Sequence, residues 1–461
     1  MMTVQEAASM LNTHWYGDDL VFSDVSTDSR QIKAGDLFVA LAGDRFDGHD
    51  YIGDTIKHGA VAALISKNIQ NIKSPQRFGW IQVADTRSAL GQLASRWRDR
   101  FSLPLVAVTG SNGKTTVKEM IASIFTKAVF HQLNSTISFP VDKVLATTGN
   151  LNNDIGVPLT LLRIRQQHAY AVVEMGMNHA GEIAYLTQLA KPDIAVITNA
   201  GAAHIEGLGS IESVAHAKGE IFQGLSESGV AIINADDDYA NLWYQLAGGR
   251  RVISFGLNPK AQVRADCHFL ASNNKWILKL PRGESEIGLQ VLGQHNVMNA
   301  LAAAAVAVGA GINESVIAEG LSAFAGVKGR MQKKNGLHEA TLIDDTYNAN
   351  PASVSAALSV LANLPGRKIL VLGDMGELGI EGAELHRKIG EAASRAGIEI
   401  LLTLGELSVN AAVGFGKGAL HFSNIDELLG EAEKLLDRNV TMLVKGSRFM
   451  KMERVIQRFE V

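Results

Sequence analysis

The chain has 461 residues, 46% of them hydrophobic, with a formal net charge of −4 and one cysteine. A chain of this length exceeds what one hydrophobic core organises, so we expect two to four domains. The small net charge and the lack of long Lys or Arg runs argue against nucleic-acid or membrane-surface partners, and a lone cysteine excludes an internal disulfide framework. Residues 1–19 lack the basic and apolar regions of a signal peptide, and no stretch reaches the roughly 18 apolar residues of a membrane span. We therefore expect a soluble, monomeric protein of the cytoplasm, with no membrane insertion.

Residues 1–84 alternate short strands with short helices and are predicted to form a small α/β domain. A strand is expected over 36–41, and polar clusters at 26–30 and 43–49 flank it, both rich in turn residues. Arginine, serine and backbone donors on loops beside a strand suit a diphosphate ligand. An ordinary solvated loop is an equally good interpretation of each cluster.

The sequence Thr-Gly-Ser-Asn-Gly-Lys-Thr-Thr at 109–116 follows an apolar run at 105–108 and precedes residues with helical apolar spacing. Strand, glycine loop and helix in this order bind phosphate, because backbone N–H groups and the helix N-terminus surround the anion. Lys114 would then reach the terminal phosphates, and the Thr115 hydroxyl would contact Mg²⁺. A strict Walker A motif has a glycine at the position of Val108, so the loop is a shortened variant, and a plain strand-to-helix turn is the alternative. The predicted ATP-binding residues of the loop are Gly110, Ser111, Asn112, Gly113, Lys114, Thr115 and Thr116.

A helix over 88–100 is expected to connect the first domain to a central α/β domain at 85–326. Each strand expected in this domain is followed by a helical segment, which predicts a mostly parallel, P-loop-type sheet with ligands at the carboxyl ends of its strands. Residues 264–292 instead predict an antiparallel hairpin insertion. The expected strands are 105–109, 170–174, 194–198 and 230–234, and the polar residues at or after their ends include Glu174, Asn199, His204, Asn234 and Asp236.

Two charged residues of the central domain stand on otherwise apolar elements. Glu174 ends an apolar strand, where a carboxylate is expected to meet a cation, and with Thr115 and His204 it could hold Mg²⁺ on nucleotide phosphates. A carboxylate on the rim of the domain is the alternative. Lys218 falls within the apolar stripe of a helix expected over 211–225. Such a lysine must extend its ammonium to solvent, pair with an anion or lose its charge, and extension to solvent is the common outcome.

Asn296 and Asn299 lie one turn apart at the start of a helix expected to reach about residue 308. Both amides could therefore address one ligand. The alternative is that Asn296 serves only as the N-cap of this helix.

A linker at 326–329 precedes Arg330 and a third, Rossmann-like α/β domain at 327–461. Each strand expected there ends in a polar turn, and Pro351 suits the first residue of a helix. The expected strands are 340–343, 369–372, 400–404 and 442–444.

Several segments resemble motifs of the Mur ligase family, in order and along nearly the whole chain. The resemblance implies three domains: a UDP-sugar-binding domain at 1–84, an ATP-binding domain at 85–326, and a mobile domain at 327–461 that completes the site. Within the family, the motifs favour the ligases that add D-alanyl-D-alanine to UDP-N-acetylmuramoyl-tripeptide, and we find no Asp-Asn-Pro-Arg motif of the diaminopimelate-adding enzymes. The matching segments are 109–116, 149–158, 174–176, 199–204, 217–220, 295–299, 329–330, 345–351 and 373–379.

The resemblance also implies the chemistry: ATP phosphorylates the terminal carboxylate of the tripeptide, and the amine of D-alanyl-D-alanine attacks the acyl phosphate, with two Mg²⁺ ions as cofactors. It implies catalytic roles for Lys114, Glu174, His204 and Lys218, and metal binding by Thr115, Glu174, His204 and Lys218, with Lys218 carbamylated. It implies nucleotide contacts for Asn299, Arg330 and Asp345. The implied substrate-binding residues are Ser29, Arg30, Arg45, Asp47, Gly48, Asn150, Asn152, Asn153, Asn348, Asn350, Lys445 and Arg448.

Three other functions stay open at this point: a neighbouring ligase on the same scaffold, a folylpolyglutamate synthase, and a P-loop nucleotide switch whose outer domains bind a protein. The sequence does not decide between diaminopimelate and lysine in the tripeptide, nor between open and closed resting domains. The stretch 130–148 is longer than the family pattern and is expected to be a surface insertion.

Overall fold

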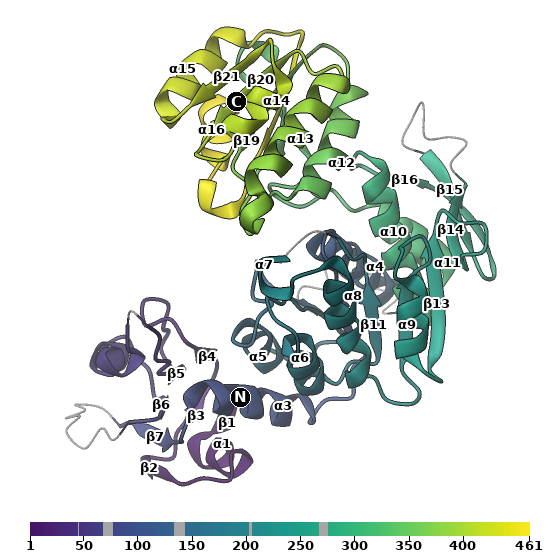
Figure 1. Ribbon diagram of the computed structural model, residues 1–461. Helices are drawn as coiled ribbons and strands as arrows, with labels where there is room; N and C mark the ends of the chain where they lie inside the picture. Colours follow the sequence, from purple (N-terminus) through teal and green to yellow (C-terminus); the bar gives the residue numbers. More distant parts are fainter. Residues whose placement is uncertain (45, 68–76, 133–142, 202–204, 267–274) are drawn as a thin grey trace.

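The computed structural model describes residues 1–44, 46–67, 77–132, 143–201, 205–266 and 275–461. In this part of the chain, three α/β domains follow one another, built on sheets of five, nine and six strands (Figure 1). The predicted three-domain α/β architecture is confirmed. A separate ribbon pairs β1 (Met2–Thr3) with β3 (Val21–Phe22). None of the described helices combines the length and apolar character needed to cross a bilayer.

The sheet of the first domain has the strand order β2-β7-β6-β5-β4, in which β2 alone runs antiparallel to its described neighbour. Its strand β5 is buried throughout, because Leu37 and Val39 face one hydrophobic cluster and Phe38 faces another. The elements are α1 (Val4–Met10), β2 (Trp15–Gly17), β4 (Val25–Ser26), β5 (Leu37–Val39), η1 (Gly48–Tyr51), α2 (Ile52–Lys57), β6 (Ala62–Ile65) and β7 (Gly79–Gln82).

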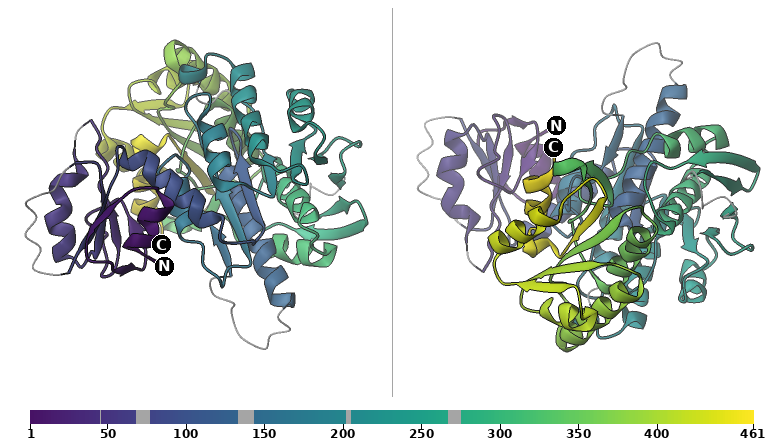
Figure 2. Two further views of the ribbon diagram at one scale, coloured as in Figure 1. Left: turned by 90° about the horizontal axis from the view of Figure 1, so that it is seen from below. Right: turned by 90° about the horizontal axis from the view of Figure 1, so that it is seen from above.

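Helix α3 (Thr86–Arg98) joins the first two domains. Asp85 caps it by accepting hydrogen bonds from the backbone N–H groups of Arg87 and Ser88, at 3.0 and 3.2 Å. Trp97 Nε1 donates to the Ile164 carbonyl at 3.1 Å, and the buried side of α3 belongs to the same cluster as one face of the central sheet. The first domain therefore packs on the central domain, at the end opposite β15 (Lys275–Leu280) and β16 (Gly283–Gly288) (Figure 2).

The central sheet has the order β16-β15-β14-β13-β12-β11-β8-β10-β9 and is parallel from β9 to β14. The antiparallel strands expected over 264–292 are present, and they extend this same sheet. The strands are β8 (Leu105–Thr109), β9 (Val144–Ala146), β10 (Tyr170–Glu174), β11 (Ile194–Ile197), β12 (Val230–Asn234), β13 (Arg251–Gly256), β14 (Val263–Asp266), β15 (Lys275–Leu280) and β16 (Gly283–Gly288).

Helices cover both faces of the central sheet, so its inner strands β8, β10, β11 and β12 are buried throughout. In β8, Leu105 and Ala107 face the cluster that includes α3, whereas Val106 and Val108 face the opposite cluster. Helices α5 (Gly156–Leu162), α6 (Glu182–Ala190), α8 (Ile211–Gly219) and α9 (Ala240–Ala247) cover the first face; α4 (Lys114–Gln132), α10 (Gln294–Gly309) and α11 (Glu314–Ser322) cover the second. The short segments α7 (Ile205–Leu208) and η2 (Glu220–Gly224) complete the domain.

The third domain lies against the central one through the region of α12, and its sheet has the order β17-β18-β22-β19-β20-β21, with β17 antiparallel at one edge (Figure 1). Helices α12, α13 and α14 cover one face and α15 and α16 the other. The elements are β17 (Gln332–Asn335), η4 (Leu337–Glu339), β18 (Thr341–Asp345), α12 (Pro351–Ala362), β19 (Arg367–Gly373), η5 (Gly379–Glu381), α13 (Gly382–Arg395), β20 (Ile400–Leu404), α14 (Val409–Phe415), β21 (Ala419–Phe422), α15 (Ile425–Leu435), β22 (Val440–Lys445), η6 (Arg448–Met450) and α16 (Glu453–Phe459).

Candidate active site

The glycine loop between β8 and α4 has the conformation that phosphate binding requires. Gly110 and Gly113 have φ angles of +151° and +85°, and a Cβ on Gly113 would lie 2.3 Å from Asn299 Oδ1. Only glycine fits these positions. Lys114 Nζ donates to the Gly110 carbonyl at 2.7 Å, so the ammonium lies over the loop itself.

Asn199, which follows β11, fixes the loop from the neighbouring strand. Its side-chain oxygen accepts from Asn112 N at 3.0 Å, and its amide donates to the Asn112 carbonyl at 3.0 Å. Its own carbonyl accepts from Ser111 N at 3.0 Å. The strand order puts β11 beside β8, so this contact follows from the topology.

Glu174 lies at the carboxyl end of β10, on the other side of β8, and is 2% exposed. Thr115 Oγ1 donates to its Oε2 at 2.9 Å, and Asn152 Nδ2 donates to its Oε1 at 2.8 Å. The structure therefore brings the predicted metal ligands Thr115 and Glu174 together, and the idea of a solvated rim carboxylate is wrong.

No group of three or more His, Cys, Asp or Glu side chains that could hold a metal occurs among the described residues. A site for Mg²⁺ on a nucleotide does not need one, because this ion keeps several waters and takes one or two protein oxygens together with phosphate oxygens. The Thr115 hydroxyl and the Glu174 carboxylate, beside a phosphate-type loop, match that donor set.

Lys218 is 2% exposed on α8, so the expectation that its ammonium reaches solvent is wrong. Among the described residues no carboxylate forms an ion pair with it. Burial, together with the positive charge of Lys114, lowers the pKa of Lys218 well below its usual value. The expected helix over 211–225 is α8 followed by the 3-10 turn η2, and Lys218 stands in the last turn of α8.

Two of the predicted site residues, Arg45 and His204, lie outside the described residues, as does much of the stretch 130–148.

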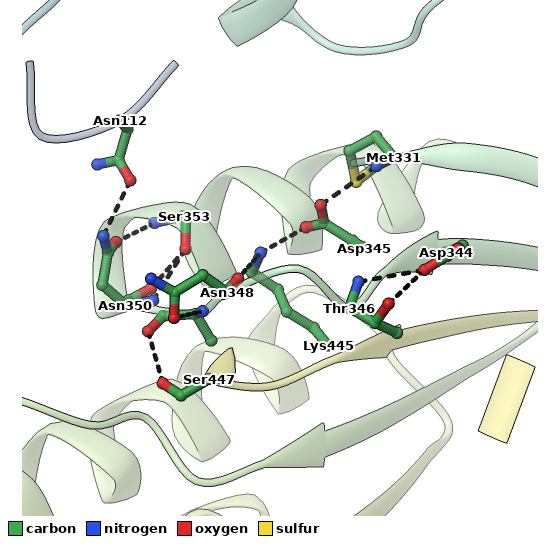
Figure 3. A network of polar contacts seen from close by, with 11 residues as sticks. Asn112, Met331, Asp344, Asp345, Thr346, Asn348, Asn350, Ser353, Lys445 and Ser447 are labelled. Carbon is green, nitrogen blue, oxygen red and sulfur yellow. Dashed lines mark hydrogen bonds and ion pairs between the residues drawn. The ribbon is translucent and has the colours of Figure 1, made fainter. Parts of the chain in front are cut away.

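The third domain reaches the glycine loop at two points. Arg330 Nη2 donates to Thr115 Oγ1 at 3.0 Å. Asn350 Nδ2 donates to Asn112 Oδ1 at 2.9 Å, as Figure 3 shows. The Arg330 guanidinium also lies 4.2 Å from the centre of the Tyr347 ring, a cation–π contact. Its Nε is buried with no hydrogen-bond partner in the described part of the chain, an orphan donor of the kind that an anionic ligand satisfies.

Asp345 and Lys445 form a buried ion pair beside these contacts. They are direct neighbours in the register of β18 and β22, and Lys445 Nζ lies 2.5 Å from Asp345 Oδ2. The same ammonium donates to the Asn348 carbonyl at 2.9 Å, and Asp345 Oδ1 accepts from Met331 N at 3.2 Å (Figure 3). The pair fixes the Asn348 turn to the strand ends.

Asn350 has a second, structural function. Its Oδ1 accepts from Ser353 N at 2.8 Å, and Ser353 Oγ accepts from Asn350 N at 3.0 Å, which together form a capping box at the start of α12. Pro351 occupies the first helical position as predicted. One side chain thus caps the helix with its oxygen and holds the glycine loop with its nitrogen.

Asn296 and Asn299 are both buried at the start of α10. The N-cap is Gly293, so an N-cap role for Asn296 is wrong. Asn299 Nδ2 donates to Asn296 Oδ1 at 3.1 Å, and Asn296 Nδ2 donates to the Leu292 carbonyl at 2.7 Å. Asn296 therefore orients Asn299, which lies against Gly113 of the loop.

A cavity of about 1120 Å³ lies between the glycine loop and the third domain. Lys114 is part of the wall of this cavity, and burial lowers the pKa of its ammonium. The positive charge of Arg330 lowers this pKa further, whereas the negative charges of Glu174 and Glu377 oppose the shift. His295, Tyr347 and Glu377 also line the cavity; they lie in the segments 295–299, 345–351 and 373–379 that resemble family motifs, but none was predicted as a site residue. The predicted residues that line it are Ser111, Asn112, Gly113, Lys114, Thr115, Thr116, Asn150, Asn152, Asn153, Glu174, Asn299, Arg330, Asp345, Asn348, Asn350, Lys445 and Arg448.

The candidates of the first domain do not line this cavity, and neither do Gly110 and Lys218. Arg30 is exposed and donates to Asp28 at 2.9 Å, which lowers the pKa of that carboxyl to about 2. Asp47 caps η1 and also contacts Lys67. Ser29 follows Asp28 in the same turn, and Gly48 is the first residue of η1.

Comparisons with known proteins cover almost the whole chain. Residues 22–98 match the catalytic domain of the Mur ligase family, residues 108–307 the Mur ligase middle domain, and residues 329–448 the glutamate ligase domain of Mur ligases. The UDP-N-acetylmuramoyl-tripeptide--D-alanyl-D-alanine ligase of Escherichia coli (strain K12) is 41% identical, over 99% of this chain and 98% of that protein. The enzyme of the same name from Haemophilus influenzae is 40% identical, over 99% and 97% of the two chains.

Solved structures give the same result. MurF from Acinetobacter baumannii is 34% identical, with a TM-score of 0.88 over 99% of this chain and 98% of that one. MurF ligase from Thermotoga maritima in complex with ADP is 26% identical, with a TM-score of 0.81 over 96% and 98% of the two chains. From these matches, together with a glycine loop facing the polar edge of a third domain, we conclude that the chain belongs to the Mur ligase family.

Proposed function

We propose that the protein is an ATP-dependent ligase that joins D-alanyl-D-alanine to UDP-N-acetylmuramoyl-tripeptide in cytoplasmic peptidoglycan precursor synthesis. Relatives of that name align over nearly its full length. The observation that carries the proposal is the cavity shared by the glycine loop of the central domain and the strand ends of the third domain. A ligase needs such a cleft, because the phosphorylated acyl group and the attacking amine must meet away from water.

ATP binds on the glycine loop, with its terminal phosphates at the backbone N–H groups of 110–116 and at Lys114. The orphan Arg330 Nε, at the end of the interdomain linker, supports an anion beside Thr115. Asn299 and Asp345 complete the nucleotide contacts. Mg²⁺, held by Thr115 and Glu174, would neutralise phosphate charge when bound.

Lys114 stabilises the negative charge that develops as the terminal phosphate moves to the substrate carboxylate. The ammonium group of D-alanyl-D-alanine loses a proton to become the attacking amine. This amine adds to the acyl carbon and loses its second proton, and the bond to phosphate breaks as the amide bond forms. The third domain orients the reactants and excludes water by closing on the loop, with Asn350 and Arg330 as the contact points.

The three domains divide the substrates between them. Residues 1–84 hold the UDP end through Ser29, Arg30, Arg45, Asp47 and Gly48, and residues 85–326 hold ATP. Residues 327–461 complete the site. The tripeptide and the dipeptide bind between the last two domains, where Asn150, Asn152, Asn153, Asn348, Lys445 and Arg448 line the cavity.

Lys218 carries a carbamate in the active enzyme. Carbon dioxide adds to the neutral amine and a proton is released, which turns the uncharged side chain into an anion able to serve a metal together with His204. Complete burial, the lack of an acidic partner among the described residues, and a pKa lowered by burial and by Lys114 support a neutral amine at this position.

The test is mass spectrometry of the product formed from UDP-N-acetylmuramoyl-tripeptide, ATP and D-alanyl-D-alanine, with phosphate release followed in parallel. We expect the tripeptide to gain one D-alanyl-D-alanine, and sustained phosphate release only when both co-substrates are present. Diaminopimelate- and lysine-containing tripeptides are compared in separate reactions. A nucleotide switch would hydrolyse ATP without the tripeptide and the dipeptide. A folylpolyglutamate synthase, or a neighbouring ligase on the same scaffold, would require a single amino acid in place of the dipeptide.

A further inference from the structure

The loop that follows β19 is held rigidly at the carboxyl edge of the third sheet. Asp374 accepts hydrogen bonds from the backbone N–H groups of Glu406 and Ser408, at 2.9 and 2.7 Å. The next residue, Met375, donates its N–H to Nε2 of the buried His386 at 2.9 Å. Both residues are therefore fixed from neighbouring elements of the same domain.

The following residue is fixed from the other side. Gly376 N donates to Ser447 Oγ at 2.8 Å, and Ser447 Oγ donates to the Ala349 carbonyl at 3.1 Å (Figure 3 shows the Ser447 contact). A Cβ on Gly376 would lie 2.9 Å from Phe449, so the loop packs closely against the segment after β22. Leu378, two residues further on, is buried in the domain core.

Glu377 stands between these anchored residues and is exposed, with a φ angle of +61°. This left-handed conformation is uncommon for a residue other than glycine, and such residues cluster at functional sites. The anchors on both sides impose it, and Glu377 lines the cavity. The fold thus directs a carboxylate into the active-site cleft at a conformational cost.

The hydrogen bond between Gly376 and Ser447 also brings the segment that carries Glu377 next to the segment that carries Arg448. Glu377 follows Gly376 and Arg448 follows Ser447, so the two charged residues lie on adjacent loops, and both line the cavity. Lys114 of the glycine loop lines the same cavity and marks the phosphate end of the proposed site. Arg448 also forms an ion pair with Glu453 at 3.1 Å and keeps 63% of its side chain exposed.

D-alanyl-D-alanine is a zwitterion whose ends are about 7 Å apart when extended. Two residues of opposite charge on neighbouring segments of the cavity wall match its two charged ends. We propose that Glu377 binds the ammonium group of the incoming dipeptide, while Arg448 receives its carboxylate. This inference rests on the proposed ligase function and adds to it the residue that orients the nucleophile.

The experiment separates the two halves of the reaction in the full-length enzyme. Hydroxylamine, a small and uncharged nucleophile at neutral pH, traps the acyl phosphate as a hydroxamate in the absence of dipeptide, and the KM for D-alanyl-D-alanine is measured separately. Glu377→Gln removes the charge and keeps the shape, and Glu377→Asp keeps the charge on a shorter side chain. Glu381→Gln, an equal change of charge four residues away on η5 and outside the cavity, is the matched control.

We expect Glu377→Gln to form hydroxamate at the wild-type rate while its KM for D-alanyl-D-alanine rises about 10- to 100-fold, the range for a lost charged hydrogen bond. The KM of Glu377→Asp for D-alanyl-D-alanine should lie between those of the wild type and Glu377→Gln. The KM of Glu381→Gln should equal that of the wild type. N-acetyl-D-alanyl-D-alanine, which lacks the ammonium, should inhibit the wild type and Glu377→Gln equally.

An unchanged KM for D-alanyl-D-alanine in Glu377→Gln would overturn the inference. A loss of hydroxamate formation as large as the loss of ligation would also overturn it, because it would place Glu377 in the ATP or Mg²⁺ site. Failure of the wild-type enzyme to form hydroxamate from UDP-N-acetylmuramoyl-tripeptide and ATP would contradict the ligase function itself.

Discussion

Asn350 of the third domain and Asn112 of the glycine loop are joined by one hydrogen bond of 2.9 Å, from Nδ2 to Oδ1. The opposite atom of the same Asn350 amide caps α12 at 2.8 Å. Placement of the third domain over the nucleotide loop is therefore coupled to the start of the helix that carries it.

This coupling predicts different effects for two substitutions. Asn350→Asp keeps an oxygen for the cap and loses the donor to Asn112, so the melting temperature should stay near that of the wild type while kcat/KM for ATP falls about 2- to 10-fold. Asn350→Ala loses both contacts and should also cost about 1 kcal/mol of stability. Steady-state kinetics and thermal melts measure the two effects.

The control is a double-mutant cycle with Asn112→Ala. If the two side chains act through their mutual contact, Asn350→Asp should have little further effect on kcat/KM for ATP in the Asn112→Ala background. Fully additive losses would show that the contact does not matter for catalysis.

Lys114→Ala should abolish ligation without unfolding the protein. The Lys114 ammonium donates mainly to a carbonyl of its own loop, so removing it breaks no contact between elements. In the reaction it neutralises transferring phosphate, and we expect kcat to fall by about three orders of magnitude or more. Product assays and thermal melts measure this; near-normal turnover with unchanged melting would refute the phosphate-loop assignment.

His386 makes the third domain sensitive to acid. Its Nε2 accepts from Met375 N at 2.9 Å and its Nδ1 lies 2.6 Å from the Gly382 carbonyl, so the neutral ring with a proton on Nδ1 fits both partners. Burial lowers the pKa of His386 below its ordinary value, and a second proton would set one N–H against another. Folding therefore favours the neutral form, and the free energy of unfolding should decrease as pH falls through about 6.5, the pKa of the unfolded histidine.

Denaturant titrations at pH 7.5 and 5.5 measure this loss, and His386→Gln serves as the comparison because it cannot be protonated. Burial also lowers the pKa of His295, but His295 is present in both proteins, so the difference between them isolates His386. Equal losses of stability in the two proteins would contradict the assignment. Because His386 anchors the loop that carries Glu377, His386→Gln should also raise the KM for D-alanyl-D-alanine at pH 7.5.

The sequence was most informative where local pattern and topology determine the outcome. Strands at 105–109, 170–174, 230–234 and 400–404 have the bounds that were expected, because each is a mainly apolar run that ends in a polar residue or just before a polar turn. The meeting of Thr115 and Glu174 was predictable, since neighbouring parallel strands end at the same edge of the sheet.

Other features left no local signal. The edge strand β17 reads Gln-Lys-Lys-Asn, and β21, which is partly exposed, reads Ala-Leu-His-Phe. Neither sequence contains the apolar run that marks a buried strand. The contacts of Arg330 and Asn350 with the loop span more than 200 residues and depend on how two domains dock. The structural use of Asn153, whose side chain accepts from Gly156 N at 2.9 Å, also appears only once α5 is placed.

Lys218 gives the last prediction. Lys218 is 2% exposed, and among the described residues no carboxylate pairs with it. A buried ammonium without a partner is costly, whereas a neutral amine that takes up carbon dioxide becomes an anion for which a metal supplies the counter-charge. We therefore expect Lys218→Ala to be nearly inactive, with partial recovery of turnover when a small carboxylate such as acetate or formate is added. Lys218→Arg should be inactive without recovery, because a guanidinium stays charged and does not take up carbon dioxide.

Activity assays with and without added carboxylate test both variants. The mass of the intact wild-type protein, recorded in bicarbonate under non-denaturing conditions, should exceed that of Lys218→Arg by one carbon dioxide, once the mass difference of the substitution itself is allowed for. An active arginine variant would contradict the carbamate, because it would show that a permanent cation satisfies the site.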